Sequence, residues 1–130
     1  MSVSPPTNVQ ALRPMRILLV SDDTKFADRV VSAAGRQGLD IARAASDDDL
    51  DVTTIRHASN VIVLDARDAL RRTARAATVF ATLHPGIAVV LVADGATTPG
   101  VSGVRLVDKW RSAERLLGEV ERAYLGLGTS

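Results

Sequence analysis

Short apolar runs alternate with amphipathic segments along most of the chain. The first run, Arg16–Val20, is apolar at four consecutive positions after Arg16, which predicts a strand buried on both faces. The second run predicts a strand less strongly, and the fourth run is the most hydrophobic. The predicted strands are 16–20, 39–45, 61–64, 87–92 and 104–107.

The segments between these runs carry apolar residues at helical spacing. The first helix has Asp22, Asp23 and Thr24 as candidate N-caps, and Gly35 and Gly38 bracket its end. The second helix, over 47–58, begins with an acidic run that suits the positive end of a helix dipole. Its inward residues are expected to be Leu50, Ile55 and Ala58, a third helix over 70–81 ends before Pro85, and Ser112 caps a last helix with Leu116, Leu117, Val120 and Tyr124 inward.

Strands that alternate with helices predict one α/β domain, a doubly wound five-stranded parallel sheet with helices on both faces. The 130 residues suit a single domain. Residues 1–14 contain three prolines and little periodicity, which indicates a flexible N-terminal tail. We therefore place the domain at residues 15–127.

Composition narrows the class of protein. The chain is 46% hydrophobic and 24% charged, which is typical of a globular domain. Its net charge of +1, without a long basic run, gives no reason to expect direct nucleic-acid binding. It contains no cysteine, which excludes disulfides, thiolate metal sites and cysteine nucleophiles. Without a long apolar run or a signal pattern, we expect a cytoplasmic protein that does not enter a membrane.

Four ionisable residues stand at the carboxyl ends of predicted strands, where parallel α/β sheets bind ligands. Asp22 and Asp23 follow the first strand, Asp65 ends the third, and Lys109 follows the fifth. Crowded carboxylates repel one another, and a hard cation such as Mg²⁺ relieves that repulsion. A central carboxylate can also accept a phosphoryl group, with a lysine pairing to its oxygens.

Three segments at these strand ends resemble the signature ends of bacterial response-regulator receiver domains. They are Leu-Leu-Val-Ser-Asp-Asp (18–23), Val-Ile-Val-Leu-Asp (61–65) and Val-Asp-Lys (107–109). The resemblance implies a flavodoxin-like receiver fold, Asp65 as the phosphoacceptor and Lys109 as the contact to the phosphoryl group. It also implies a Mg²⁺ ion held by Asp22, Asp23, Asp65 and the carbonyl of Arg67.

Three positions depart from the receiver pattern. Ala93 stands where receivers carry Thr or Ser, and Leu106 stands where they carry an aromatic switch residue. Trp110 replaces the proline that follows the lysine through a cis bond. A cis bond before a residue other than proline costs about 3–4 kcal/mol. We therefore expect a trans bond here, with a displaced Lys109 loop.

The link between the fourth and fifth strands is the last departure. Receivers place a helix there, but residues 94–103 contain three glycines and a proline and no apolar stripe. Glycine costs about 1 kcal/mol and proline about 3 kcal/mol inside a helix. We expect this fourth helix to be missing or vestigial, which would bare an apolar patch near Val92, Leu106 and Trp110.

The resemblance implies an atypical, non-enzymatic receiver domain of two-component signalling. Its partners would be a histidine kinase or other phosphodonor, and a partner protein or attached DNA-binding or ATPase output domain. The alternative is a receiver-like module that acts without phosphorylation, in protein interaction or as a homodimer. A third hypothesis, a small α/β hydrolase for phosphate esters, lacks a recognisable general base.

Overall fold

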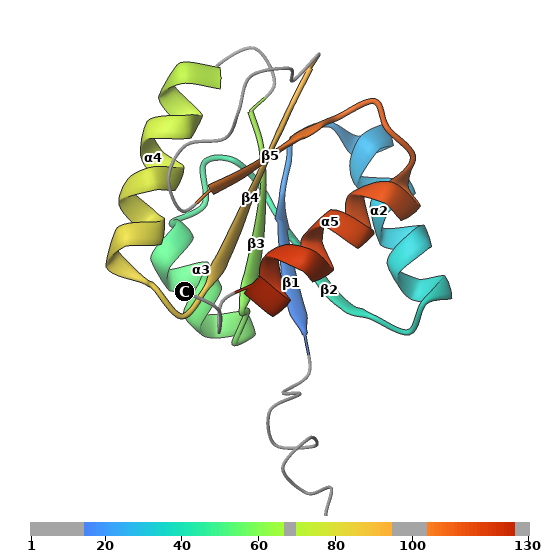
Figure 1. Cartoon of the computed structure of the whole chain (residues 1–130), viewed down its shortest axis with the longest axis horizontal. Helices are drawn as coiled ribbons and strands as arrows, with labels where there is room; N and C mark the ends of the chain where they lie inside the picture. Colours follow the sequence, from blue (N-terminus) through green and yellow to red (C-terminus); the bar gives the residue numbers. More distant parts are fainter. Residues whose placement is uncertain (1–14, 67–69, 95–103, 127–130) are drawn as a thin grey trace, which may run out of the picture.

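The computed structural model describes residues 15–66, 70–94 and 104–126, which form five strands and four helices (Figure 1). The prediction of a five-stranded α/β fold is confirmed. The elements are β1 (Arg16–Val20), α2 (Thr24–Arg36), β2 (Asp40–Ala44), α3 (Leu50–His57), β3 (Val61–Asp65), α4 (Leu70–Leu83), β4 (Ala88–Ala93), β5 (Val104–Asp108) and α5 (Ala113–Leu125).

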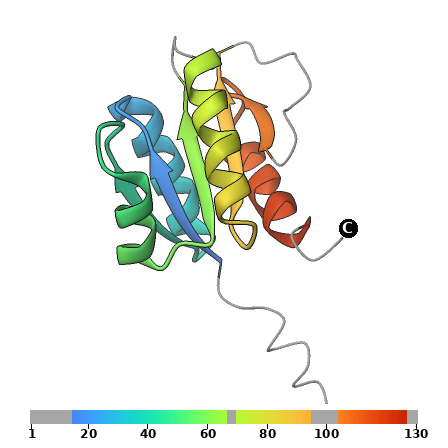
Figure 2. The ribbon, with the colours of Figure 1, turned by 90° about the vertical axis from the view of Figure 1, so that its left-hand side faces the viewer.

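All five strands are parallel and lie in the order β2-β1-β3-β4-β5. Helices α2 and α5 cover one face of the sheet, and α3 and α4 cover the other (Figures 1 and 2). Strand β2 lies on one side of β1, whereas β4 and β5 follow β3 on the opposite side. The carboxyl ends of β1 and β3 therefore flank the point where the winding reverses, which is the usual ligand site in such sheets.

Each face of the sheet has its own hydrophobic core, because alternate side chains of a strand point to opposite faces. Ile17 and Leu19 of β1 pack with α2 and α5, whereas Leu18 packs on the α4 side. Strands β3 and β4 are buried at every position. The apolar runs in the sequence thus correspond to strands covered on both faces.

Three polar side chains begin the helices as capping rules predict. The carboxylate of Asp23 accepts from the Phe26 amide, and that of Asp49 accepts from the Val52 amide. The Ser112 hydroxyl accepts from the Arg115 amide. At the end of α2, Gly38 adopts a φ of 71°, a left-handed conformation that glycine enters without steric cost.

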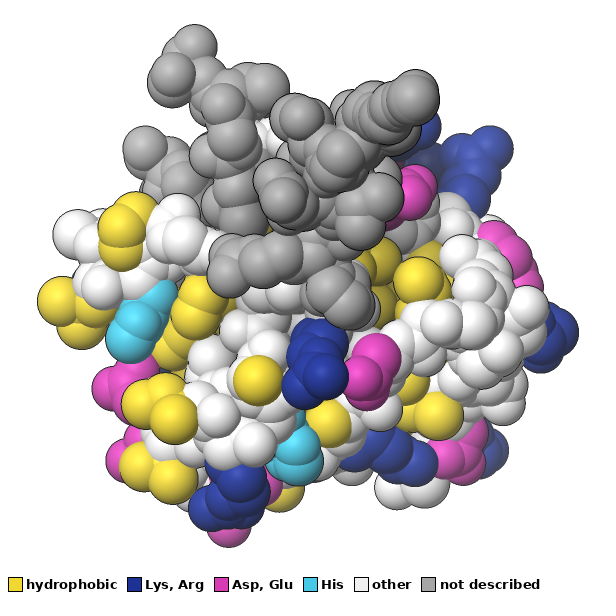
Figure 3. All heavy atoms as spheres, turned by 90° about the horizontal axis from the view of Figure 1, so that it is seen from below, with side chains coloured by type: hydrophobic (Ala, Val, Ile, Leu, Met, Phe, Trp, Pro, Cys, Tyr) yellow, Lys and Arg dark blue, Asp and Glu magenta, His cyan; other side chains and the backbone are white. Residues whose placement is uncertain are grey.

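The predicted inward face of the second helix is wrong at two positions. Ile55 is 75% exposed, and Ala58 is an exposed, left-handed C-cap with a φ of 52°. Because Asp49 is the cap, the helix begins at Leu50, and residues three and four later share its face. Thr53 and Thr54 are therefore the buried residues. Of the seven exposed large hydrophobic side chains among the described residues, five belong to α3 and α4 (Figure 3), namely Val52, Ile55, Leu70, Val79 and Leu83.

Two predictions fall on residues 1–14 and 95–103, which lie outside the described residues. The flexible tail and the missing or vestigial fourth helix therefore stay predictions. The apolar patch expected beside that link is wrong at Val92, because this side chain is fully buried against the α2–α5 core. Within the described ranges, no helix has the length and apolar character needed to cross a membrane.

Candidate functional site

Asp65 lies at the carboxyl end of β3, the middle strand of the sheet. Its side chain has no exposed surface. The Ser21 hydroxyl donates a 2.7 Å hydrogen bond to Asp65 Oδ2. A buried carboxylate is stable only when its charge and lone pairs are satisfied by neighbours. The surroundings of Asp65 therefore decide what this residue can do.

Lys109 supplies the positive charge for this pocket. Its Nζ lies 2.8 Å from Asp23 Oδ2 and 3.1 Å from Asp65 Oδ2, and its side chain is only 6% exposed. The Lys109 amide also donates a 2.9 Å bond to the Ala93 carbonyl, which ties the lysine to the end of β4. The prediction that strand-end residues converge is confirmed for Asp23, Asp65 and Lys109. Their roles toward a phosphoryl group stay predictions.

Burial alone would lower the pKa of Lys109, because it penalises the charged form. The hydrogen bonds and charges of Asp23 and Asp65 outweigh that penalty and raise the pKa above the ordinary 10.5. A lysine whose folded pKa is raised stabilises the fold below its unfolded pKa, and that contribution disappears as pH rises through the folded pKa. The stabilisation by Lys109 is therefore complete at neutral pH and is lost only above pH 10.5.

This pKa is measurable because the chain has only two lysines, Lys25 and Lys109. With lysine-selective isotope labelling, we expect the Lys109 side-chain signal to titrate with a midpoint above 10.5. A Lys25→Arg variant assigns the two signals. A Lys109 midpoint at or below 10.5 would show that desolvation outweighs the two carboxylates.

The adjacent aspartates at the end of β1 turn in different directions. Asp23 caps α2 through Oδ1 and contacts Lys109 through Oδ2. Asp22 is exposed, and its carboxylate accepts from the amide of Ser46 at 2.9 Å and from the Ser46 hydroxyl. The hydrogen bonds described for Asp22 thus lead to the loop after β2, rather than to Lys109 with the other two carboxylates.

Ser21 is a site residue that reasoning from charge missed. In the β1–β3 register, Val20 pairs with Leu64, so the next positions along the two strands are Ser21 and Asp65. The register places a neutral hydroxyl, and not a carboxylate, against Asp65. Ser21 could have been found by pairing Asp65 with the residue beside it on the neighbouring strand. That pairing requires the strand order, which the sequence alone does not give.

The donor set only partly fits a Mg²⁺ ion. Mg²⁺ binds through one or two carboxylates and several waters, and Asp23 and Asp65 are two carboxylates that share one partner. That partner is the Lys109 ammonium, which already offsets their charge. Among the described residues, no group of three or more His, Cys, Asp or Glu side chains is arranged to hold a metal ion. Arg67 lies outside the described residues. Mg²⁺ binding stays a prediction, with Asp23 and Asp65 as its candidate ligands.

The three positions that depart from the receiver pattern lie at the end of β4, within β5 and directly after Lys109. Ala93 ends β4, is buried and has no hydroxyl to offer. Leu106 is half-buried against the α4-side core. Trp110 is 58% exposed, and its Nε1 donates to the Asp94 carboxylate. Its ring lies 5.5 Å from Lys109 Nζ and 5.8 Å from the guanidinium carbon of Arg29, within cation–π range.

The described residues contain no cis peptide bond, so the expected trans bond between Lys109 and Trp110 is confirmed. The expected displacement of Lys109 is not seen at its ammonium group, which contacts both Asp23 and Asp65. The flexible lysine side chain reaches both carboxylates from a trans backbone.

No family model matches the chain, and no curated protein matches it. Solved structures do match. An atypical orphan response regulator, described as revealing a new phosphorylation-independent regulatory mechanism, superposes with a TM-score of 0.67 and 18% identity. That match covers 85% of this chain and 96% of the other.

Two further solved structures have the same architecture. NtrX from Brucella abortus matches with a TM-score of 0.70 and 19% identity over 88% of this chain, which spans 27% of NtrX. The chemotaxis response regulator CheY4 of Vibrio cholerae matches with a TM-score of 0.67 and 16% identity, covering 85% of this chain and 99% of that one. The chain therefore has the receiver fold of response regulators, as its strand-end residues predicted.

Proposed function

We propose that this chain is a receiver-fold protein-interaction module whose signalling does not depend on phosphorylation of Asp65. The observation that carries the proposal is the environment of the Asp65 carboxylate. It is fully buried, and its Oδ2 accepts from both the Ser21 hydroxyl and the Lys109 ammonium. A carboxylate acts as a nucleophile only when the phosphoryl donor can reach it, and the burial of Asp65 opposes this.

Two neighbouring features support the same conclusion. The residue opposite Asp65 on β1 is the neutral Ser21, and the described hydrogen bonds of Asp22 go to Ser46. Ala93 offers no hydroxyl that would bond a phosphoryl group and follow it inward. The atypical orphan response regulator with the same fold is described as using phosphorylation-independent regulation.

The second candidate function is a phosphoacceptor receiver, and the contact between Lys109 and Asp65 favours it. In that case Asp23 and Asp65 would hold Mg²⁺, which would neutralise charge on the incoming phosphoryl group. Lys109 would then exchange a carboxylate partner for phosphoryl oxygens, and Asp65 would be the nucleophile. Histidine kinases would be the natural donors for such a receiver.

Intact-mass spectrometry after incubation with a small phosphodonor and Mg²⁺ separates the two candidates. We expect no phosphoryl mass on the native chain, so that its spectrum equals that of Asp65→Asn. A Ser21→Asp/Ala93→Thr variant serves as the comparison, since it supplies the carboxylate and hydroxyl that the pocket lacks. Phosphoryl mass on the native chain that Asp65→Asn abolishes would overturn the proposal in favour of the phosphoacceptor.

A further inference from the structure

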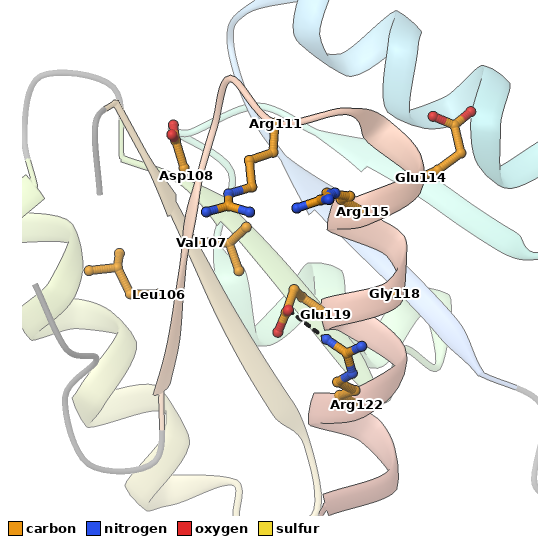
Figure 4. Close-up of a pocket in the computed structure, with 9 residues that line it drawn as sticks. All are labelled: Leu106, Val107, Asp108, Arg111, Glu114, Arg115, Gly118, Glu119 and Arg122. Atoms are coloured by element: carbon orange, nitrogen blue, oxygen red, sulfur yellow. Dashed lines mark hydrogen bonds and ion pairs between the residues drawn. The ribbon is translucent and has the colours of Figure 1, made fainter. Parts of the chain in front are cut away.

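The turn that joins β5 to α5 carries the one tryptophan of the chain, Trp110. Its amide donates a 3.0 Å hydrogen bond to the Asp108 carboxylate, and the Arg111 amide donates to the Asp108 carbonyl at 3.3 Å. An aspartate that accepts from the amide two residues later closes a turn without any proline. Figure 4 shows the Arg111 side chain directed into the groove between β5 and α5. Trp110, in contrast, makes its contacts with Lys109, with α2 and with the end of β4.

The Trp110 ring is one of four groups around the Lys109 ammonium. Lys109 Nζ lies 5.5 Å from the centre of the Trp110 ring and 5.2 Å from the centre of the Phe26 ring. Its other neighbours are the carboxylates of Asp23 and Asp65. Aromatic faces attract a cation, and they do so more strongly where water is excluded. The ring therefore helps to keep Lys109 in the pocket, although the lysine belongs to a surface turn.

Two contacts from other parts of the chain hold this ring. Trp110 Nε1 donates to the carboxylate of Asp94, directly after β4. The guanidinium carbon of Arg29, on α2, lies 5.8 Å from the Trp110 ring and 6.0 Å from the Phe26 ring. Trp110 belongs to neither hydrophobic core, and more than half of its surface is exposed. The ring can therefore turn outward without leaving a cavity in the core.

We propose that Trp110 is a gate on the Asp65 pocket. With the ring held by Asp94 and Arg29, Lys109 stays paired with Asp23 and Asp65. With the ring turned outward, the Lys109 ammonium meets water and can leave the two carboxylates. The gate thus controls whether the charge of Asp65 is compensated from within the pocket. The inference rests on the proposed function only in taking the paired pocket as the resting state of the protein.

Hydrogen exchange of the lysine ammonium groups tests the gate. With lysine-selective nitrogen-15 labelling at one fixed pH, the Lys109 ammonium protons should exchange more slowly than those of the exposed Lys25, the internal standard. Trp110→Ala should speed Lys109 exchange relative to Lys25 by about tenfold, the order expected for a lost, partly desolvated cation–π contact. Leu125→Ala is the matched control, because Leu125 is 56% exposed and Trp110 is 58% exposed. It should leave the ratio unchanged.

Two further variants distinguish a gate from a general loss of stability. Trp110→Phe keeps an aromatic ring but removes the Nε1 donor, so it should speed Lys109 exchange less than Trp110→Ala does. Asp94→Ala should also speed the exchange. Adding Asp94→Ala to Trp110→Phe should change nothing more, because Asp94 acts on the ring only through Nε1. This set stays decisive even if Trp110→Ala lowers the melting temperature enough to expose both lysines.

The same Lys109-to-Lys25 ratio in the native chain, Trp110→Phe and Asp94→Ala would overturn the inference. An Asp94→Ala effect that persists in the Trp110→Phe background would overturn it as well. The exchange experiment contains no phosphodonor. Phosphoryl mass on Asp65 would therefore overturn the proposed function and leave the gate unchanged.

Discussion

Lys109→Met is expected to lower the free energy of unfolding by about 3–5 kcal/mol, the usual cost of removing one partner from a buried ion pair. Lys109 is almost fully buried, and its loss leaves Asp65 buried without a compensating charge. Chemical denaturation at neutral pH measures the change. Lys25→Met is the matched control, because Lys25 is exposed on the first turn of α2 and surface substitutions change stability by about 0.5 kcal/mol at most.

A double variant identifies why Lys109→Met lowers the stability. Adding Asp65→Asn to Lys109→Met removes the uncompensated charge and should recover part of the lost stability. The double variant is then more stable than the sum of the single changes predicts, as expected for residues in direct contact. If Lys109→Met cost no more than Lys25→Met, solvent would have to reach the pocket and satisfy Asp65.

Ser21→Asp is expected to convert the pocket into one that depends on a divalent cation. The substitution places a second carboxylate where a hydroxyl now lies 2.7 Å from Asp65 Oδ2. Like charges at this distance raise the pKa of a carboxyl group, so the variant should be less stable than the native chain in chelator near neutral pH. Because these folded-state pKa values are raised, the loss should appear as pH rises through the carboxyl range and disappear in acid.

Mg²⁺ should restore what Ser21→Asp removes. An ion that binds only the folded state at about 100 times its dissociation constant adds about 2.7 kcal/mol. Melting temperatures in chelator and in millimolar Mg²⁺ measure this difference, which should be larger for the variant than for the native chain. Ser32→Asp, on the exposed side of α2, controls for added charge. Equal Mg²⁺ shifts in Ser21→Asp and Ser32→Asp would contradict the role given to Ser21.

Strand ends were well predicted because their signals are local. Arg16–Val20 was expected as a strand and is β1, and Asp65 was expected at the carboxyl end of the third strand and ends β3. Continuous apolar runs indicate strands covered on both faces. A polar residue directly after such a run therefore lies at the carboxyl end of the strand. The short second helix was predicted less well, since moving its start to Leu50 rotated Ile55 out of the core.

By itself, the sequence predicted the order of elements, the parallel sheet and the gathering of Asp22, Asp23, Asp65 and Lys109 at the carboxyl ends of the strands, where the structure joins the last three. These follow from hydrophobic period and from chain order, which are properties of single segments. Only the tertiary structure decided that Ser21 faces Asp65, that Asp22 bonds Ser46 and that Lys109 bonds both other carboxylates. Those contacts depend on strand register and on side chains that meet from segments far apart in the chain. Neither the register nor these long-range contacts can be read from the separate segments.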